Sequence, residues 1–171
     1  SFIKEAVSKR MKACKLELNS EKTHIVYCKN HVHHENHKNT SFDFLGYTFR
    51  PLRRPTKNGW KLTYFPVMSQ TSKKEVRRRL KKVVNRKFRG SIQEMAKIIN
   101  PMIRGWYQYF CKYSKWTTRG LWYWLNRKIT KWIGMYRKRS RARARKWLIN
   151  VYKTNPNLFE HWKPILNGRP Y

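Results

Sequence analysis

The Lys and Arg side chains are the residues of this sequence that most clearly point to a chemical function. Its 171 residues include 41 Lys and Arg against 8 Asp and Glu, a formal net charge of +33. A chain with this imbalance repels itself unless it meets a polyanion, and each phosphate that it neutralises releases counterions. Nucleic acid is therefore the first expected partner, and a membrane surface is the second.

The acidic residues are too sparse for phosphoryl-transfer chemistry. Asp43 is the only aspartate, and the glutamates are scattered singly along the chain. A two-metal centre needs clustered carboxylates that hold its cations about 4 Å apart. We therefore assign no catalytic residue and no metal site, and we expect that the chain does not polymerise or cut nucleic acid unaided.

The segment from residue 28 to residue 37 holds one cysteine and four histidines. A zinc site usually has paired ligands at regular gaps and a second pair further along the chain. Here the ligand types crowd one polar stretch without a later pair, so we expect an exposed loop. Cys14, Cys28 and Cys111 are odd in number and widely spaced, which indicates a reducing compartment and no disulfide framework.

Several elements must position the charge, and the first is a predicted helix from Phe2 to Lys12 with an apolar stripe. It begins at residue 1 without a cap, so we expect that the chain was cut from something longer. Residues 16–18 and 23–27 are typical of short strands around a turn.

Residues 42–66 predict a β-hairpin. Its first strand covers residues 42–50, and Pro51 and Pro55 are expected to end it. A long basic connection that contains both prolines, followed by a Lys-Asn-Gly turn signal, leads to an alternating second strand. Pro66 is expected to close the β part.

Helical patterns follow. Residues 72–75 and 91–94 both match the capping-box signature, and each precedes an apolar stripe. They predict helices over about 73–88 and 92–99.

The stretch 100–110 has a helix-start signal of its own. Asn100 suits an N-cap, and Pro101 suits the first helical position. Trp106 lies on its apolar stripe and is expected to anchor the core. Gly105 costs roughly 1 kcal/mol relative to Ala inside a helix, which indicates a close approach by another element.

A further helix is expected to start near Thr118 and to run into the basic residues 137–146, and 155–171 resemble a turn with a weakly structured tail. The predicted fold class is α+β, in which a small helix and β-hairpin precede a mainly helical domain. The domain boundary is placed between residues 1–68 and 69–171. No apolar run approaches the roughly 20 residues needed to span a bilayer.

The basic residues of the helices are the expected binding residues. Like charges four residues apart destabilise an isolated helix, and Arg77 with Lys81 is one such pair. A phosphate backbone along the helix would reverse that effect. The residues predicted to bind the nucleic acid are Lys73, Lys74, Arg77, Arg78, Lys81, Lys82, Arg104, Arg127, Lys128, Lys131, Arg137, Lys138, Arg139, Arg141, Arg143, Arg145 and Lys146.

Three aromatic residues off the apolar stripes, Trp116, Tyr123 and Trp124, are candidates for stacking on unpaired bases. Most of the other aromatic residues fall on the stripes and are expected in the core. The composition alone is compatible with RNA and with DNA.

Three motifs in order resemble one family. Residues 16–26 resemble the L-x-L-N-x-E-K-T-x-I motif of group II intron-encoded reverse transcriptases, and residues 42–51 are similar to the F-L-G-Y-x-F motif at the end of the palm. Residues 100–110 resemble the N-P-x-I-R-G-W-x-x-Y-F core of the maturase-specific domain, also called domain X or the thumb. The resemblance covers nearly the whole chain.

This resemblance implies a fold and a set of roles. Residues 1–68 would be the C-terminal edge of the reverse transcriptase palm, and residues 69–171 would be the thumb. Phe44, Leu45 and Gly46 would lie in the neighbourhood of the primer grip. The family's catalytic Tyr-x-Asp-Asp motif, whose aspartates hold Mg²⁺, is absent from this sequence, so it is not expected to polymerise alone.

The resemblance also implies the partners. We expect the chain to bind group II intron RNA and to assist its folding and splicing; in the full protein, reverse transcription and mobility follow. Alternatives are a thumb for a split reverse transcriptase, which would need an upstream palm segment and an RNA/DNA template-primer, and a general basic nucleic-acid-binding helical protein. The expected location is the bacterial cytoplasm or an organellar matrix, without secretion.

Overall fold

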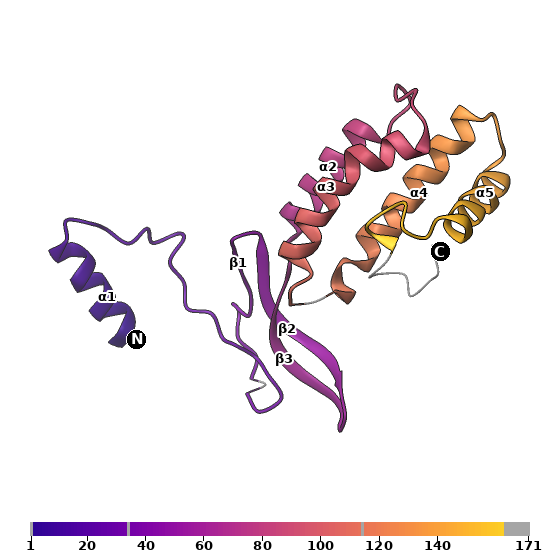
Figure 1. The fold of residues 1–171 in the computed structure, drawn as a ribbon. Coiled ribbons are helices and arrows are strands. Elements are labelled where there is room, and N and C mark those ends of the chain that lie inside the picture. The colour runs from indigo at the N-terminus through magenta and orange to yellow at the C-terminus, as the bar shows by residue number, and fades with distance from the viewer. Residues whose placement is uncertain (1, 34, 114, 163–171) are drawn as a thin grey trace. The chain divides into compact units, whose positions relative to one another are not determined.

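The computed structural model describes residues 2–33, 35–113 and 115–162, and its elements confirm the α+β class (Figure 1). In chain order they are α1 (Phe2–Ala13), β1 (Phe42–Phe44), β2 (Tyr47–Thr56), β3 (Gly59–Met68), α2 (Gln70–Val83), α3 (Ile92–Phe110), the 3₁₀ turn η1 (Trp116–Thr118), α4 (Arg119–Tyr136) and α5 (Arg141–Thr154). The strands form one sheet in the order β1-β2-β3.

The chain forms two compact units. One holds the chain up to Phe42 together with Arg50–Tyr64, and the second holds Asp43–Phe49 and the chain from Phe65 onward. In the first unit α1 forms as predicted but buries none of its residues. The strands predicted at 16–18 and 23–27 are wrong, because these segments find only isolated backbone partners, such as the N–H of Tyr27 donating to Asn39, and no strand ladder.

The hairpin prediction needs three corrections. The predicted strand 42–50 is two strands, because Leu45 and Gly46 form a tight turn with φ of 48° and 78°. Pro51 and Pro55 do not end a strand, and the expected basic connection is part of β2. β1 has only three residues, so it leaves this part of β2 with an open edge, where a missing N–H is tolerated.

The β3 strand begins at the predicted Lys-Asn-Gly turn. Gly59 adopts a φ of 96°, and the Thr56 hydroxyl donates to its carbonyl at 2.7 Å. Pro66 does not close the β part, because β3 continues to Met68. Val67 and Met68 are buried, so the strand ends inside the second unit's apolar core.

Helix α2 begins three residues before the expected cap. Ser69 is the N-cap, and its hydroxyl oxygen accepts from the backbone N–H of Ser72 at 3.1 Å. Ser72 is therefore inside the helix, and its hydroxyl donates to the carbonyl of Gly46 at 3.0 Å. The helix ends at Val83 and does not reach residue 88. After its end, the side-chain amide of Asn85 donates a hydrogen bond to the carbonyl of Lys82.

Helix α3 is continuous through the second predicted start signal. The capping box of Ser91 and Glu94 is confirmed, but Asn100 is not an N-cap. The Asn100 side chain instead bonds to the backbone of residues 158 and 160. Pro101 lies in the helix interior, where it removes one backbone hydrogen bond.

Two expectations for the α3 stripe are also wrong. A Cβ at Gly105 would meet nothing within 4 Å, so this glycine does not serve a close approach. Trp106 is only half-buried against the core, whereas Ile99 and Ile103 are fully buried. The buried face of the helix therefore lies to one side of the predicted stripe.

Helices α4 and α5 pack against each other, and the basic run 137–146 is divided between the connection after α4 and the first turns of α5 (Figure 1). We expected α4 to continue into this run, but it stops at Tyr136. Ser140 then caps α5, and its hydroxyl oxygen accepts from the N–H of Arg143 at 3.4 Å. Among the described residues, no helix is long and apolar enough to cross a bilayer.

Candidate nucleic-acid interface

The cations of α2 form the first part of the basic surface. Lys73, Lys74, Arg77, Arg78, Lys81 and Lys82 all lie on this helix. Glu75 accepts hydrogen bonds from Arg78 at 2.7 and 2.8 Å and from Arg79 at 2.8 Å. These bonds lower the pKa of Glu75 to about 2, so the carboxylate stays charged and offsets part of the positive charge of α2.

Trp124 joins the α2 cations to those of α4. The guanidinium of Arg77 lies 5.5 Å from the centre of its ring, and the ammonium of Lys128 lies 5.8 Å from it. Both distances are within the range of a cation–π interaction. The Nε atom of Arg77 is buried and has no hydrogen-bond partner among the described residues.

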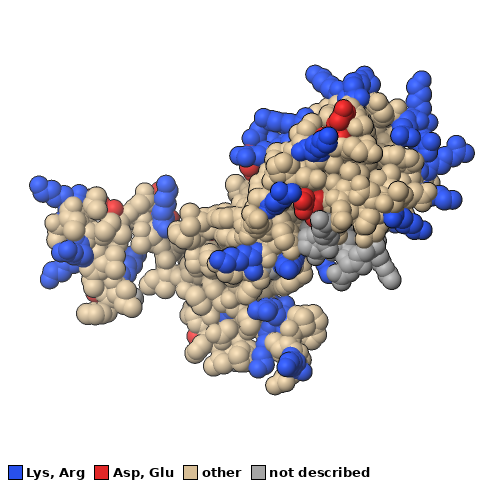
Figure 2. Space-filling model, viewed as in Figure 1, with Lys and Arg blue, Asp and Glu red and all other residues tan. Residues whose placement is uncertain are grey.

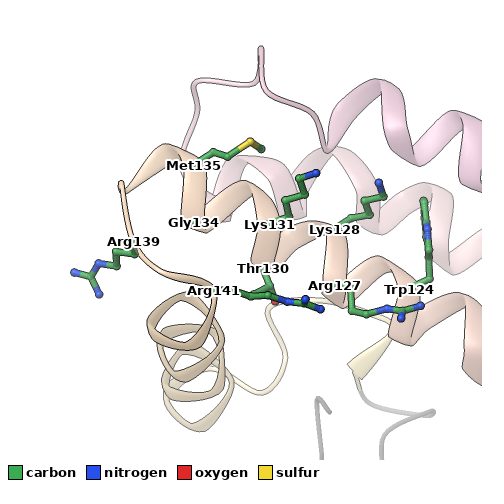
Figure 3. Close-up of a pocket in the computed structure, with 9 residues that line it drawn as sticks. All are labelled: Trp124, Arg127, Lys128, Thr130, Lys131, Gly134, Met135, Arg139 and Arg141. Carbon is green, nitrogen blue, oxygen red and sulfur yellow. The ribbon is translucent and has the colours of Figure 1, made fainter.

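A hollow on the outer side of α4 collects most of the predicted residues from this helix and the following turn. Figure 3 shows its lining side chains, and Arg139 points away from the others. We call it the α4 hollow, and its lining residues are Trp124, Arg127, Lys128, Thr130, Lys131, Gly134, Met135, Arg139 and Arg141.

A second depression runs between α4 and α5. It shares Arg127, Thr130 and Arg141 with the α4 hollow, so the two are continuous. We call it the α4–α5 groove, and among the described residues it is lined by Gly120, Tyr123, Arg127, Thr130, Arg141, Ala142, Arg145, Lys146 and Ile149.

The charge on this side is not balanced by acids. Arg127, Lys128 and Arg141 have no carboxylate partner among the described residues. In Figure 2 many Lys and Arg side chains project from the edges of the helical part, and acids are few on the face in view. Arg137 is held differently, because its guanidinium lies 4.4 Å from the centre of the Trp147 ring.

The opposite side of α4 is buried and uncharged. Asn126 is fully buried, and its Oδ1 atom accepts from Nε2 of His161 at 2.7 Å and from Nε1 of Trp162 at 3.0 Å. Burial lowers the pKa of His161 to about 3, so the imidazole is neutral, and its Nδ1 has no described hydrogen-bond partner. This network fixes α4 from inside.

The turn predicted at Asn155-Pro156 is present, but the weakly structured tail predicted after it is wrong for residues 157–162. Phe159, His161 and Trp162 are fully buried in the core, because the Asn100 amide holds the backbone at residues 158 and 160. The remainder of the predicted tail, 163–171, lies outside the described residues.

Arg104 lies apart from the α4 hollow and is engaged in an ion pair. Its Nη2 atom donates to the Glu160 carboxylate at 2.7 Å, although the Arg104 side chain is 61% exposed. This pair joins α3 to the segment that follows α5. Arg104 is the predicted binding residue for which the structure offers the clearest structural role.

The primer-grip-like residues belong to another part of the second unit. Phe44 and Leu45 are exposed and line a depression with Tyr109 of α3. Gly46 lies close to Phe110, where a Cβ would come within 3.5 Å of the ring. The Tyr109 hydroxyl donates to the carbonyl of Leu45 at 2.7 Å, which ties the turn to α3.

The stacking candidates differ in exposure. Trp116 is 45% exposed, whereas Tyr123 and Trp124 are partly buried against the core. Sequence reasoning missed Gly120 and Thr130, which share the groove with Tyr123. The spacing of Gly120, Tyr123 and Arg127 along one helix is the signal that could have placed them on one face.

The described residues contain no group of three or more His, Cys, Asp or Glu that could hold a metal. His31, His33 and His37 are exposed, as expected of the loop, and His34 lies outside the described residues. The three cysteines are free. The residues present therefore do not fit the Mg²⁺ that the resemblance attaches to the palm, and no step is assigned to that ion.

Comparison with known families identifies the helical segment. The sequence model described as "Group II intron, maturase-specific domain" matches residues 73–152, from the first turn of α2 nearly to the end of α5. The match includes the α4 hollow and the α4–α5 groove. No curated protein matched the sequence. Residues 73–152 of this chain are therefore similar to the group II intron maturase-specific domain.

Proposed function

We propose that this chain binds group II intron RNA and assists the intron in folding and splicing. The observation that carries the proposal is the coincidence of the matched segment, 73–152, with the basic helices α2, α4 and α5. Their cations would neutralise RNA phosphates, and the partly buried Trp124 between Arg77 and Lys128 would hold two of these cations in place.

The division of labour within the chain is part of the proposal. Residues 69–171 would act as the RNA-binding thumb, and residues 1–68 would be the edge of a palm. The bacterial cytoplasm and an organellar matrix are the compartments where such an RNA would be met.

A salt titration tests RNA recognition. Binding of a labelled group II intron RNA should weaken steeply as salt rises, because each cation–phosphate contact releases a counterion. A random DNA duplex of similar length should bind more weakly than the intron at moderate salt. Equal affinity for both nucleic acids at every salt concentration would contradict intron recognition and favour a general nucleic-acid-binding protein.

A second candidate function is supported by α1. Phe2 and Ile3 are 85% and 74% exposed, and none of the residues of α1 is buried. Exposed apolar side chains in a helix suit a protein partner, so the chain could supply a thumb to a reverse transcriptase completed by a separate palm. Mixing the chain with a palm fragment should then give primer extension. The absence of DNA synthesis in the mixture would contradict this alternative.

A further inference from the structure

The α4–α5 groove has features that charge alone does not explain. Gly120 lies in the first turn of α4, where it is exposed and a Cβ would meet nothing within 4 Å. Glycine is unfavourable in a helix relative to alanine, so its presence here has no packing reason. What the missing side chain leaves is open space beside Tyr123, which lines the same groove.

The two ends of the groove differ in chemistry. Gly120 and Tyr123 lie in the first two turns of α4. Arg127 lies further along α4, on the part of the helix toward which Arg141 of α5 reaches (Figure 3). One part of the groove therefore offers an aromatic ring beside an open space, and the other offers two guanidinium groups.

The guanidinium end is suited to a phosphate. Figure 3 shows Arg141 reaching from α5 toward the side of α4 that carries Thr130 and Arg127. Both arginines line the groove as well as the α4 hollow, and neither has a carboxylate partner among the described residues. Two like charges on one depression repel each other, and an anion between them would reverse that repulsion. A guanidinium is well matched to phosphate oxygens.

The width of the α4–α5 groove favours single-stranded over double-stranded nucleic acid. Packed helices lie about 8–10 Å apart, so the surface groove between them is far narrower than a nucleic-acid duplex. In an A-form duplex the base faces are also stacked away from protein side chains, whereas unpaired bases can be splayed onto aromatic rings.

We infer that the α4–α5 groove receives an unpaired stretch of RNA, with a base on Tyr123 in the space beside Gly120 and a phosphate between Arg127 and Arg141. The inference takes RNA as the ligand from the proposed function, and it adds that the RNA bound in this groove is single-stranded. Gly120 is then a specificity-determining residue, because it keeps the base end of the groove open.

Filling the groove is the most direct experiment. A Gly120→Leu side chain would occupy the base end, and leucine is a better helix former than glycine, so folding should be retained. Binding of a labelled 12-nucleotide oligouridine should weaken by about 5- to 100-fold, the range expected for one lost stacking contact. Binding of an RNA hairpin with a fully paired stem should change by less than about twofold.

Two matched pairs of variants serve as controls. Tyr123→Leu removes the ring but keeps an apolar side chain against the core, and it should act like Gly120→Leu, whereas Tyr123→Phe should bind the oligonucleotide as wild type does. Arg141→Gln should weaken oligouridine binding more than Arg139→Gln, which removes the same charge from a side chain that points away from the hollow. Unchanged thermal unfolding shows that each variant is folded.

Different results would contradict the groove assignment and the proposed function. Unchanged oligouridine binding by both Gly120→Leu and Tyr123→Leu, or an equal loss for the hairpin, would overturn the groove assignment. A wild-type chain that shows no preference for intron RNA over duplex DNA, while still losing oligouridine binding through these variants, would contradict only intron recognition.

Discussion

The polar side chains on the two sides of α4 are in opposite environments. On the inner side Asn126 is fully buried and bonded to a neutral His161 and to Trp162. On the outer side Arg127 and Lys128 have no carboxylate partner among the described residues. Buried polar groups need hydrogen-bond partners within the protein, whereas exposed cations are hydrated by water and remain available to bind a ligand. One helix therefore separates the stability of this domain from its binding surface.

The largest predicted effect is on the inner side. Trp162→Ala should lower the free energy of unfolding by about 3–5 kcal/mol, because it empties a fully buried site and removes a hydrogen bond to Asn126. Urea denaturation measures the change. Trp116→Ala, at a 45% exposed tryptophan, is the matched control and should cost much less. A loss below about 1 kcal/mol for Trp162→Ala would show that residues 155–162 do not close the core.

Acid should also destabilise the domain through the inner side. The pKa of His161 is lowered to about 3 by burial, against an ordinary value near 6.5. Between these values the unfolded chain binds the extra proton, so stability falls as pH falls below 6.5. The loss approaches about 1.4 kcal/mol per pH unit.

A series of denaturation curves between pH 7 and pH 5.5 measures this slope, in a window above the titration of ordinary carboxylates. His161→Gln keeps an amide donor toward Asn126 and should flatten the slope. An unchanged slope in that variant would assign the acid sensitivity to other groups.

The outer side should respond in binding and not in stability. Replacing Arg127, Lys128 and Lys131 together by glutamine should lower the unfolding free energy by at most about 1 kcal/mol, because Arg127 and Lys131 are exposed and only Lys128 loses a cation–π contact with Trp124. The slope of log K against log salt for intron RNA should fall by about 2, at roughly 0.7 for each lost phosphate contact with a single strand.

The control for this variant removes equal charge elsewhere. Arg50, Arg53 and Lys57 are exposed residues of the hairpin, outside the matched segment. Their joint replacement by glutamine should change the salt slope less than the α4 variant does. Equal changes would mean that net charge, and not the surface of α4, governs binding.

The smallest effect is expected on α2. Glu75→Gln would release Arg78 and Arg79 from their shared carboxylate. Intron RNA affinity should rise at low salt by at most about fivefold, since exposed ion pairs are weak. The gain should vanish at high salt through screening. A decrease in affinity would mean that Glu75 orders the two arginines for binding instead of competing with RNA for them.

The sequence predicted the helices better than the strands. Apolar stripes and the capping box at Ser91 located the helical domain, because these are local signals. The strands at 16–27 were predicted wrongly, since a strand depends on a partner that the local pattern does not reveal. Asn100 shows the same limit, because a good N-cap residue was used to hold a segment 58 residues away along the chain.

The candidate site was partly predictable. The basic residues of α4 and α5 could be named from their charge, but their meeting at one groove depends on how the two helices pack against each other. The pairing of Arg104 with Glu160 joins residues 56 positions apart, and no local pattern indicates it.

Splicing of a group II intron precursor RNA tests the account most directly. Under ionic conditions where the RNA alone splices poorly, adding the wild-type chain should increase the rate of splicing. The folded variant with glutamine at positions 127, 128 and 131 should give much less of this increase, because it lacks the outer cations of α4. No stimulation by the wild-type chain, or equal stimulation by the variant, would contradict the assignment of intron RNA binding to this surface.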